Sequence, residues 1–95
     1  MNKYPVEVGS FVISKAGRDE GRLFVVIQEV DADFVMIANG ELRKLDRLKK
    51  KRRKHLKSTG RVAEELRARL ADGKPVLDCE LRSWLEEEEE KLVQV

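Results

Sequence analysis

Short apolar segments separated by turn residues dominate the first half of the chain and constrain its fold most. Leu23–Val30 and Phe34–Ala38 are rich in β-branched and aromatic residues and too short for helices. A similar cluster, Phe11–Ile13, lies within Val8–Ala16. These segments predict three β-strands, with Asp31–Asp33 as a hairpin-sized connection between the second and the third.

A turn dipeptide predicts how the chain continues. Asn39-Gly40 is the preferred pair for a two-residue type I′ hairpin turn, because both positions need positive φ. It therefore predicts a fourth strand at Glu41–Leu45, followed by a basic loop and a fifth strand at Lys54–Lys57. Five short strands favour a small barrel over an open sheet, because a barrel leaves no strand edge free to pair with other chains.

The segment Arg43–Leu56 admits a second interpretation. Leu42, Leu45 and Leu48 recur every three residues, so a helical turn could continue past the fourth strand. We prefer a strand followed by a loop, because Lys49–Lys54 offers no apolar side chain to hold either face of a helix.

The hydrophobic period changes from that of strands to that of helices in the second half. The first expected helix has Thr59 as its N-cap and stops at Asp72-Gly73, where glycine can adopt the left-handed conformation. The second helix is capped by Asp78. Neither helix can bury its apolar stripe alone, so each must pack on the other, on the barrel or on a partner. The stripes are Val62, Ala63, Leu66 and Leu70 in the first helix and Leu81, Trp84, Leu85 and Leu92 in the second.

These patterns predict an α+β protein that is mainly β. We expect a small barrel with a basic arm over residues 1–58 and two amphipathic helices with an acidic end, forming a helical hairpin, over residues 59–95.

The composition argues against several classes of protein. The longest apolar runs, Leu23–Ile27 and Phe34–Ala38, fall far short of the ~20 residues that span a bilayer. The N-terminal segment lacks the basic and apolar regions of a secretory signal. The single cysteine, Cys79, cannot form an intrachain disulfide, and we interpret it as a half-buried small residue. We therefore expect a cytoplasmic protein without metal or cofactor.

The net charge of +2 conceals an uneven distribution. Residues 1–60 hold 14 basic and 8 acidic side chains, whereas residues 61–95 hold 6 basic and 10 acidic ones. Most of the asymmetry comes from Arg43–Lys57, which has ten Lys and Arg and a single acid, Asp46. Such asymmetry indicates contact with a polyanion at the basic end.

Glycines bound the connection between the first two expected strands. Gly17 and Gly21 allow a tight turn with positive φ at its ends, and they leave the backbone open to close approach by a phosphate. Lys15, Arg18 and Arg22 flank this turn. The alternative is that the glycines only serve a hairpin in a generic barrel.

The same region resembles a known motif. The turn Gly17–Leu23 (GRDEGRL) between two apolar strands is similar to the KOW motif of ribosomal proteins and transcription elongation factors. Over roughly Val8–Leu45 the chain resembles small bacterial KOW-domain RNA-binding proteins, similar to the L14e-type large-subunit ribosomal protein family. The segment Leu42–Leu45, the lysine run and Lys54–Leu56 add to this likeness. The resemblance implies an SH3-like (KOW) β-barrel and binding to RNA or the ribosome.

Six consecutive cations, Lys49–Lys54 (KKKRRK), form the strongest charge feature. Neutralising phosphates releases counterions, so such a run favours salt-sensitive and largely sequence-independent binding of nucleic acid. With ~6 phosphates engaged, the log–log salt slope would be about −4 on single strands. The alternatives are a solubilising surface loop or a targeting signal.

The aromatic residues offer little base stacking. Phe11, Phe24 and Phe34 lie in apolar runs and are expected in the core, which leaves Tyr4 as the one stacking candidate. We therefore expect backbone and shape recognition of structured RNA. His55, the sole histidine, is expected to contact phosphate or ribose rather than a metal.

The acidic run Glu86–Glu90 has two interpretations. It is either a solvated helix end or a polyanion mimic that folds back on Lys49–Lys54 and tunes RNA affinity.

The function expected from the sequence is non-enzymatic RNA binding in association with the ribosome, with ribosomal RNA as the favoured partner. No catalytic group is expected. One alternative is a protein-interaction adaptor in translation or transcription that docks on a ribosomal or polymerase protein through the C-terminal helices, and another is DNA binding. The candidate RNA-binding residues are Lys15, Arg18, Arg22, Arg43, Lys44, Arg47, Lys49, Lys50, Lys51, Arg52, Arg53, Lys54, His55 and Lys57, with Gly17 and Gly21 in the turn.

Overall fold

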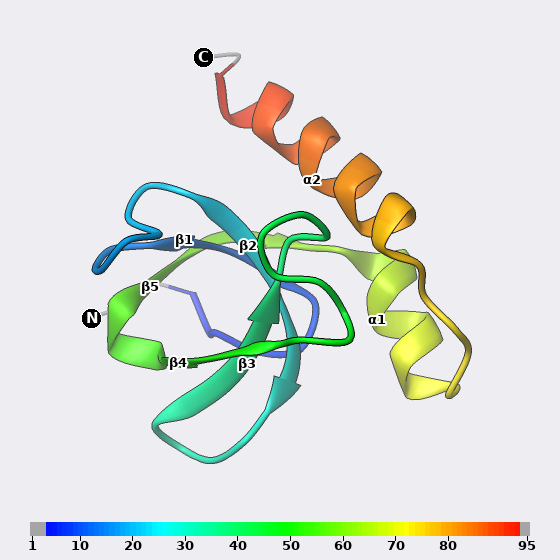
Figure 1. The fold of residues 1–95 in the computed structure, drawn as a ribbon, viewed down its shortest axis with the longest axis horizontal. Coiled ribbons are helices and arrows are strands. Elements are labelled where there is room, and N and C mark those ends of the chain that lie inside the picture. The colour runs from blue at the N-terminus through cyan, green and yellow to red at the C-terminus, as the bar shows by residue number, and fades with distance from the viewer. Residues whose placement is uncertain (1–3, 94–95) are drawn as a thin grey trace.

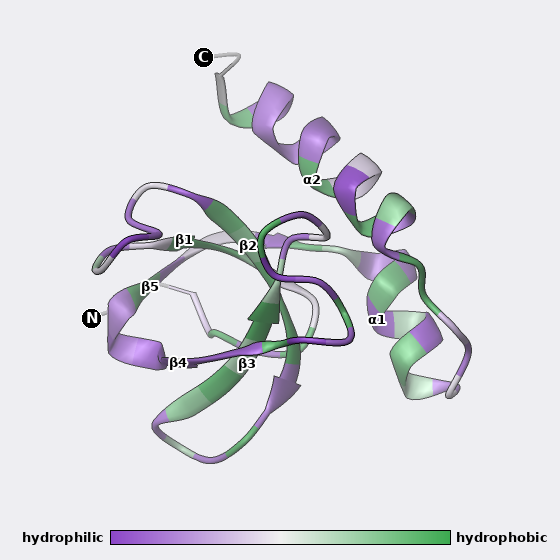
Figure 2. Ribbon diagram, viewed as in Figure 1, coloured by the Kyte–Doolittle hydropathy of each residue, from purple (hydrophilic) through white to green (hydrophobic). Residues whose placement is uncertain are grey.

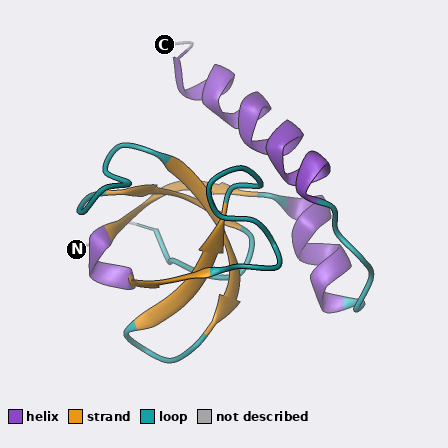
Figure 3. Cartoon of the chain, in the orientation of Figure 1, coloured by secondary structure: helices purple, strands orange, loops and turns teal. Residues whose placement is uncertain are grey.

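The first two thirds of the chain form one five-stranded antiparallel sheet, and two helices follow it (Figure 1 and Figure 3). The computed structural model describes residues 4–93, which make a small α+β domain, as the sequence predicts. The elements are β1 (Ser10–Ser14), β2 (Leu23–Glu29), β3 (Phe34–Ala38), β4 (Lys49–Arg52), the 3₁₀ helix η1 (Arg53–His55), β5 (Leu56–Val62), α1 (Glu64–Ala71) and α2 (Asp78–Val93).

The sheet is curved into a barrel-like shape. Its strand order is β4-β3-β2-β1-β5, so β4 and β5 are its two edges, yet only η1 separates them in sequence. The four peptide units from Arg52 to Leu56 reach at most about 14 Å, whereas the edges of a flat five-stranded sheet lie about 19 Å apart. Irregular register in β1–β5 and in β2–β3 gives the bends that bring the edges together.

The sheet buries both of its faces, which explains why the apolar residues of β2 form a run rather than alternate. One face fills the interior of the barrel, and the other is covered by the helices. A strand buried on both faces needs apolar side chains at successive positions, as at Leu23–Val26. The interior cluster is Val6, Val12, Phe24, Val26, Val35, Ile37 and Leu56, and the cluster beneath the helices is Phe11, Leu23, Val25, Ala38, Ala63, Leu66, Leu81 and Leu85.

The prediction of a fourth strand at Glu41–Leu45 is wrong. Among the described residues only glycines have positive φ, so Asn39-Gly40 does not form a type I′ turn. Instead, Asn39 Oδ1 accepts hydrogen bonds from the amides of Glu41 and Arg43, both at 3.0 Å, which holds an irregular loop over residues 39–48. This loop contains no helix, so the alternative of a helical turn is also wrong.

The fourth strand is instead the cationic segment Lys49–Arg52, which was expected to be a loop. It pairs with β3 along its whole length, from Phe34 opposite Arg52 to Ile37 opposite Lys49. Figure 2 shows the contrast between the hydrophilic β4 and the apolar β2 and β3 beside it.

The fifth strand is longer than expected and removes the predicted break. It extends to Val62, so Thr59 lies within β5 and is not the N-cap of a helix. α1 begins at Glu64, after Ala63, whose side chain makes no capping hydrogen bond. The expected boundary after residue 58 therefore falls inside a strand that is hydrogen-bonded to β1.

The helices end and pack largely as the apolar pattern predicts. α1 stops at Ala71, and Gly73 has the positive φ of 69° expected after a helix end. Leu81 and Leu85 are buried against the sheet, whereas Leu92 is exposed. Within residues 4–93, neither helix has the length and apolar content needed to cross a membrane.

The start of α2 is fixed by the loop over residues 39–48. Asp78 Oδ1 accepts a hydrogen bond from the Leu45 amide at 2.8 Å, a contact between distant segments in place of the local cap expected. Gly40 is required here, because a Cβ on it would lie 2.6 Å from the carbonyl oxygen of Asp78. Arg82 Nη1 donates to the Gly40 carbonyl at 2.7 Å, which completes the attachment.

Candidate nucleic-acid interface

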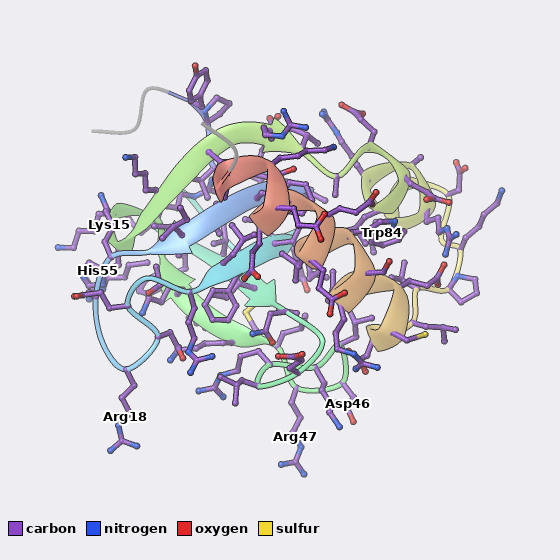
Figure 4. The ribbon with its side chains drawn as sticks, turned by 90° about the horizontal axis from the view of Figure 1, so that it is seen from above. Lys15, Arg18, Asp46, Arg47, His55 and Trp84 are labelled. Atoms are coloured by element: carbon purple, nitrogen blue, oxygen red, sulfur yellow. The ribbon has the colours of Figure 1, made fainter. Side chains whose placement is uncertain are left out.

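The glycine-bounded turn between β1 and β2 has the conformation that its sequence predicts. Gly17 and Gly21 have φ values of 80° and 85°, in the left-handed region that favours glycine. The Gly21 amide donates to the Ser14 carbonyl at 2.8 Å, and the Glu20 amide donates to the Gly17 carbonyl at 3.2 Å. The turn is therefore closed by its own backbone and displays Arg18 at its tip (Figure 4).

Two lysines of β4 hold this turn from below. Lys49 and Lys51 pair with Ile37 and Val35 of β3, which belong to the interior cluster, so both lysines lie on the inner side of the barrel. Lys49 Nζ donates to Asp19 Oδ2 at 2.7 Å, and Lys51 Nζ donates to the carbonyl of Ala16 at 2.9 Å. These cations are engaged within the protein and tie β4 to the β1–β2 turn.

Asp19 is the acidic partner in this attachment and is buried. The hydrogen bond from Lys49 is the main cause that lowers the pKa of the Asp19 carboxyl below its ordinary value, although burial opposes the shift. The charges of Lys49, Arg43 and Lys51 act in the same direction as the hydrogen bond. Asp19 is therefore ionised at neutral pH and binds a lysine of the run.

A third cation of the run, Arg53, is also engaged within the protein. Its guanidinium donates to the carbonyls of Val6 and Asp31 and pairs with Glu29 Oε1 at 2.7 Å. Its amide donates to the Asp33 carbonyl at 2.8 Å. Arg53 thus joins the end of β4 to the β2–β3 connection, and half of the six consecutive cations have internal partners.

The other three cations of the run are exposed. Lys50 and Arg52 alternate with the inner lysines and lie on the outer side of β4. The Lys50 ammonium lies 4.6 Å from the centroid of the Phe34 ring, and the Arg52 guanidinium lies 5.3 Å from it. Phe34 is only partly buried and supports these two side chains through cation–π contacts. Lys54, in η1, is exposed as well.

Segments far apart in the sequence gather exposed cations at one end of the barrel. The Lys15 amide donates to the His55 carbonyl at 2.8 Å, which places the end of β1 beside η1, and Figure 4 shows the two side chains close together. We call this surface the basic end. It comprises Lys15, Arg18 and Arg22 around the turn and Lys54, His55 and Lys57 around η1.

The loop over residues 39–48 adds cations on a neighbouring surface. Lys44 and Arg47 are exposed, whereas Arg43 is partly buried. Arg47 and Arg18 project from the same side of the molecule in Figure 4. Acidic Asp46 and Glu20 are also exposed here, so the positive surface is interrupted at these two points.

The structure separates the candidate stacking and ligand residues from one another. Tyr4 is partly exposed, and its ring packs on Gly60 of β5, where an added Cβ would lie 2.8 Å from the ring. His55 is partly buried in η1. Phe11 and Phe24 are buried, as expected. Residues 4–93 contain no group of three His, Cys, Asp or Glu side chains that could hold a metal ion.

Two residues of this surface escaped the interpretation of the sequence. Phe34 was expected in the core, and Asp19 was given no role. The alternation of Lys49 and Lys51 with Lys50 and Arg52 would have indicated Phe34, since a strand places every second residue on one face. No local signal indicates Asp19, because Lys49 is 30 residues away from it in the chain.

The acidic run does not fold back on β4. Glu86–Glu90 lies within α2, whose C-terminal half is far from β4 in Figure 1. Glu88 is buried and pairs with Arg61 of β5, whereas the other four glutamates are exposed. The chain thus keeps its acidic run and its basic end on different surfaces.

Comparison of the chain with models of known protein families and with curated protein sequences found no match to either.

Proposed function

We propose that this protein is a non-enzymatic RNA-binding module that recognises the backbone of structured RNA through the basic end and the outer side of β4. The observation that carries the proposal is the attachment of the Gly17–Gly21 turn to β4 by Lys49 and Lys51. It fixes the positions of exposed cations from two separate segments, so that they contact phosphates as a preformed set. Preorganisation lowers the entropy cost of binding.

Structured RNA is favoured over sequence-specific single strands because the surface lacks an aromatic platform. Phe34 is covered by Lys50 and Arg52, and Tyr4 lies on Gly60. Contacts from Lys and Arg to phosphates set position and affinity without reading bases. The barrel-like sheet and the glycine turn are compatible with an SH3-like barrel of the KOW type, and we extend the proposal to ribosomal RNA and the cytoplasm on that resemblance.

The test compares two triple variants that lose the same charge. Replacing Lys15, Arg18 and Arg22 with Gln removes three cations from the turn, and replacing Arg67, Lys74 and Lys91 with Gln removes three exposed cations from the helical region. In fluorescence anisotropy with a labelled RNA hairpin at 0.15 M salt, we expect the turn variant to bind about fiftyfold more weakly, since each lost phosphate contact costs about fourfold at this salt. The helix variant should bind like the wild type.

Equal losses in the two variants would show that only net charge matters and would refute the proposed surface. A DNA hairpin of the same sequence serves as the competitor. Displacement of the RNA at equal concentrations of DNA and RNA would replace the assignment to RNA with one to nucleic acid of either kind.

A further inference from the structure

A groove of about 260 Å³ lies where the end of β5, α1 and the C-terminal half of α2 meet, away from the basic end. Phe11, Leu66 and Trp84 supply its apolar lining, together with Val62 and Ala63. Leu81 and Leu85 are buried in the core and do not line it. The apolar stripe of α2 is thus used for folding, and the groove beside it is the surface left for a ligand.

Glu88 gives the groove an unusual polar group. Its side chain is only 3% exposed and lines the groove. Arg61 Nε donates to Oε1 at 2.9 Å and lies 2.6 Å from Oε2, but its single hydrogen points to one oxygen. Among the described residues, Oε2 has no hydrogen-bond donor. A carboxylate can accept about four hydrogen bonds, so this buried group has capacity for a further cationic donor.

The charges around the groove select the sign of its ligand. Four glutamates line it, against two cations. The lining therefore favours a positively charged ligand and disfavours the phosphates of a nucleic acid. The charged residues of the lining are Glu64, Glu65, Glu87 and Glu88, with Arg61 and Lys91.

The aromatic residue of the groove already contacts a guanidinium. The Arg69 guanidinium lies 5.5 Å from the centroid of the Trp84 ring. Arginine is suited to such a site, because its planar group donates in a fork to a carboxylate and also stacks on aromatic and apolar surfaces. Lysine matches the charge but lacks both the fork and the plane.

We propose that this groove binds an arginine side chain from a basic segment of a partner protein, with the arginine stem against Phe11 and Trp84 and its guanidinium on Glu88. The Arg61 side chain is half exposed, so it can turn outward and open Oε2 to the incoming donor. The groove then contacts protein while the basic end stays free for nucleic acid. This inference rests on Glu88 and the groove and is independent of the RNA-binding proposal.

The experiment uses Trp84 as a local reporter, because it is the only tryptophan in the chain. The full chain, labelled with ¹⁵N, is titrated with the acetylated and amidated peptide Ala-Leu-Arg-Leu-Ala while heteronuclear NMR spectra are recorded. We expect a saturable shift of the Trp84 indole N–H signal. The matched peptide with citrulline, which keeps the shape of arginine without its charge, should bind about tenfold more weakly, as expected for loss of a buried charged contact.

Variants of the acidic run locate the contact. Glu88→Gln should weaken peptide binding about tenfold, and Glu90→Gln, an exposed position outside the groove, should leave it unchanged. If Glu88→Gln does not fold, the comparison of the arginine and citrulline peptides on the wild type still decides. Equal binding of the two peptides, no shift of the indole signal at millimolar peptide, or a shift produced by an RNA hairpin would overturn the proposal.

Discussion

Two pairs of substitutions in β4 remove the same charge from opposite sides of one strand. Lys50→Gln with Arg52→Gln removes the outer cations, and Lys49→Gln with Lys51→Gln removes the inner ones. The alternation of burial along β4 predicts that these double variants differ in kind. The outer pair should lose affinity for RNA and keep its stability, whereas the inner pair should lose stability.

The structure sets the size of each effect. At 0.15 M salt, each phosphate contact contributes about fourfold to affinity and about 0.7 to the salt slope, so the outer pair should bind about fifteenfold more weakly with a slope reduced by about 1.4. The inner pair loses the hydrogen bonds to Asp19 and to the carbonyl of Ala16. Charged hydrogen bonds contribute about 1.5–3 kcal/mol each, and partial exposure of Lys49 lowers its share, so the free energy of unfolding should fall by about 2–4 kcal/mol.

Two measurements on each variant test this reasoning. Urea denaturation followed by circular dichroism gives the free energy of unfolding, and anisotropy titrations with an RNA hairpin at several salt concentrations give the slope. The titrations are made under conditions in which both variants are folded. If both pairs reduce the slope equally and neither changes stability, the inner lysines are not engaged as described and the reasoning fails.

Three further predictions concern stability. Because the pKa of Asp19 is lowered in the folded state, its ionised form stabilises the protein above about pH 4, and this contribution disappears as the pH falls through the lowered pKa; in urea titrations Asp19→Asn should therefore be less stable than the wild type at pH 7, and the difference should shrink towards pH 2. Gly21→Ala should cost about 1–2 kcal/mol for its positive φ alone, because nothing lies within 4 Å of the added Cβ, whereas Gly40→Ala should cost clearly more because its Cβ meets the Asp78 carbonyl; similar losses in thermal denaturation would contradict the role given to Gly40. Leu81→Ala, at a fully buried position, should cost about 2–5 kcal/mol in one cooperative transition, and separate melting of the helices and the sheet would show that they do not share a core.

The features predicted correctly are those that local sequence determines. Leu23–Val26 and Phe34–Ala38 are strands because their apolar β-branched residues have two faces to fill. Gly17 and Gly21 have positive φ because the turn needs it, and Gly73 follows the end of α1 for the same reason. Each of these outcomes depends on residues within a few positions of one another.

The features that were missed depend on distant contacts. β4 contains no apolar residue, and it is a strand because β3 pairs with it and because Asp19 and Ala16 receive its inner lysines. Asn39 precedes glycine as in a hairpin, but its side chain organises a loop that Asp78 holds from the other end of the molecule. A run of six cations likewise does not reveal which of them have internal partners.

The separation of the acidic α2 from the basic end gives the molecule an electric dipole moment. In the field of a polyanion, such a dipole experiences a torque before contact, which turns the Gly17–Gly21 turn towards the charged surface and the exposed glutamates of α2 away from it. The near-zero net charge gives little attraction at long range, so alignment rather than accumulation is the electrostatic benefit. Encounters should therefore be few but already oriented, with α2 facing the solvent.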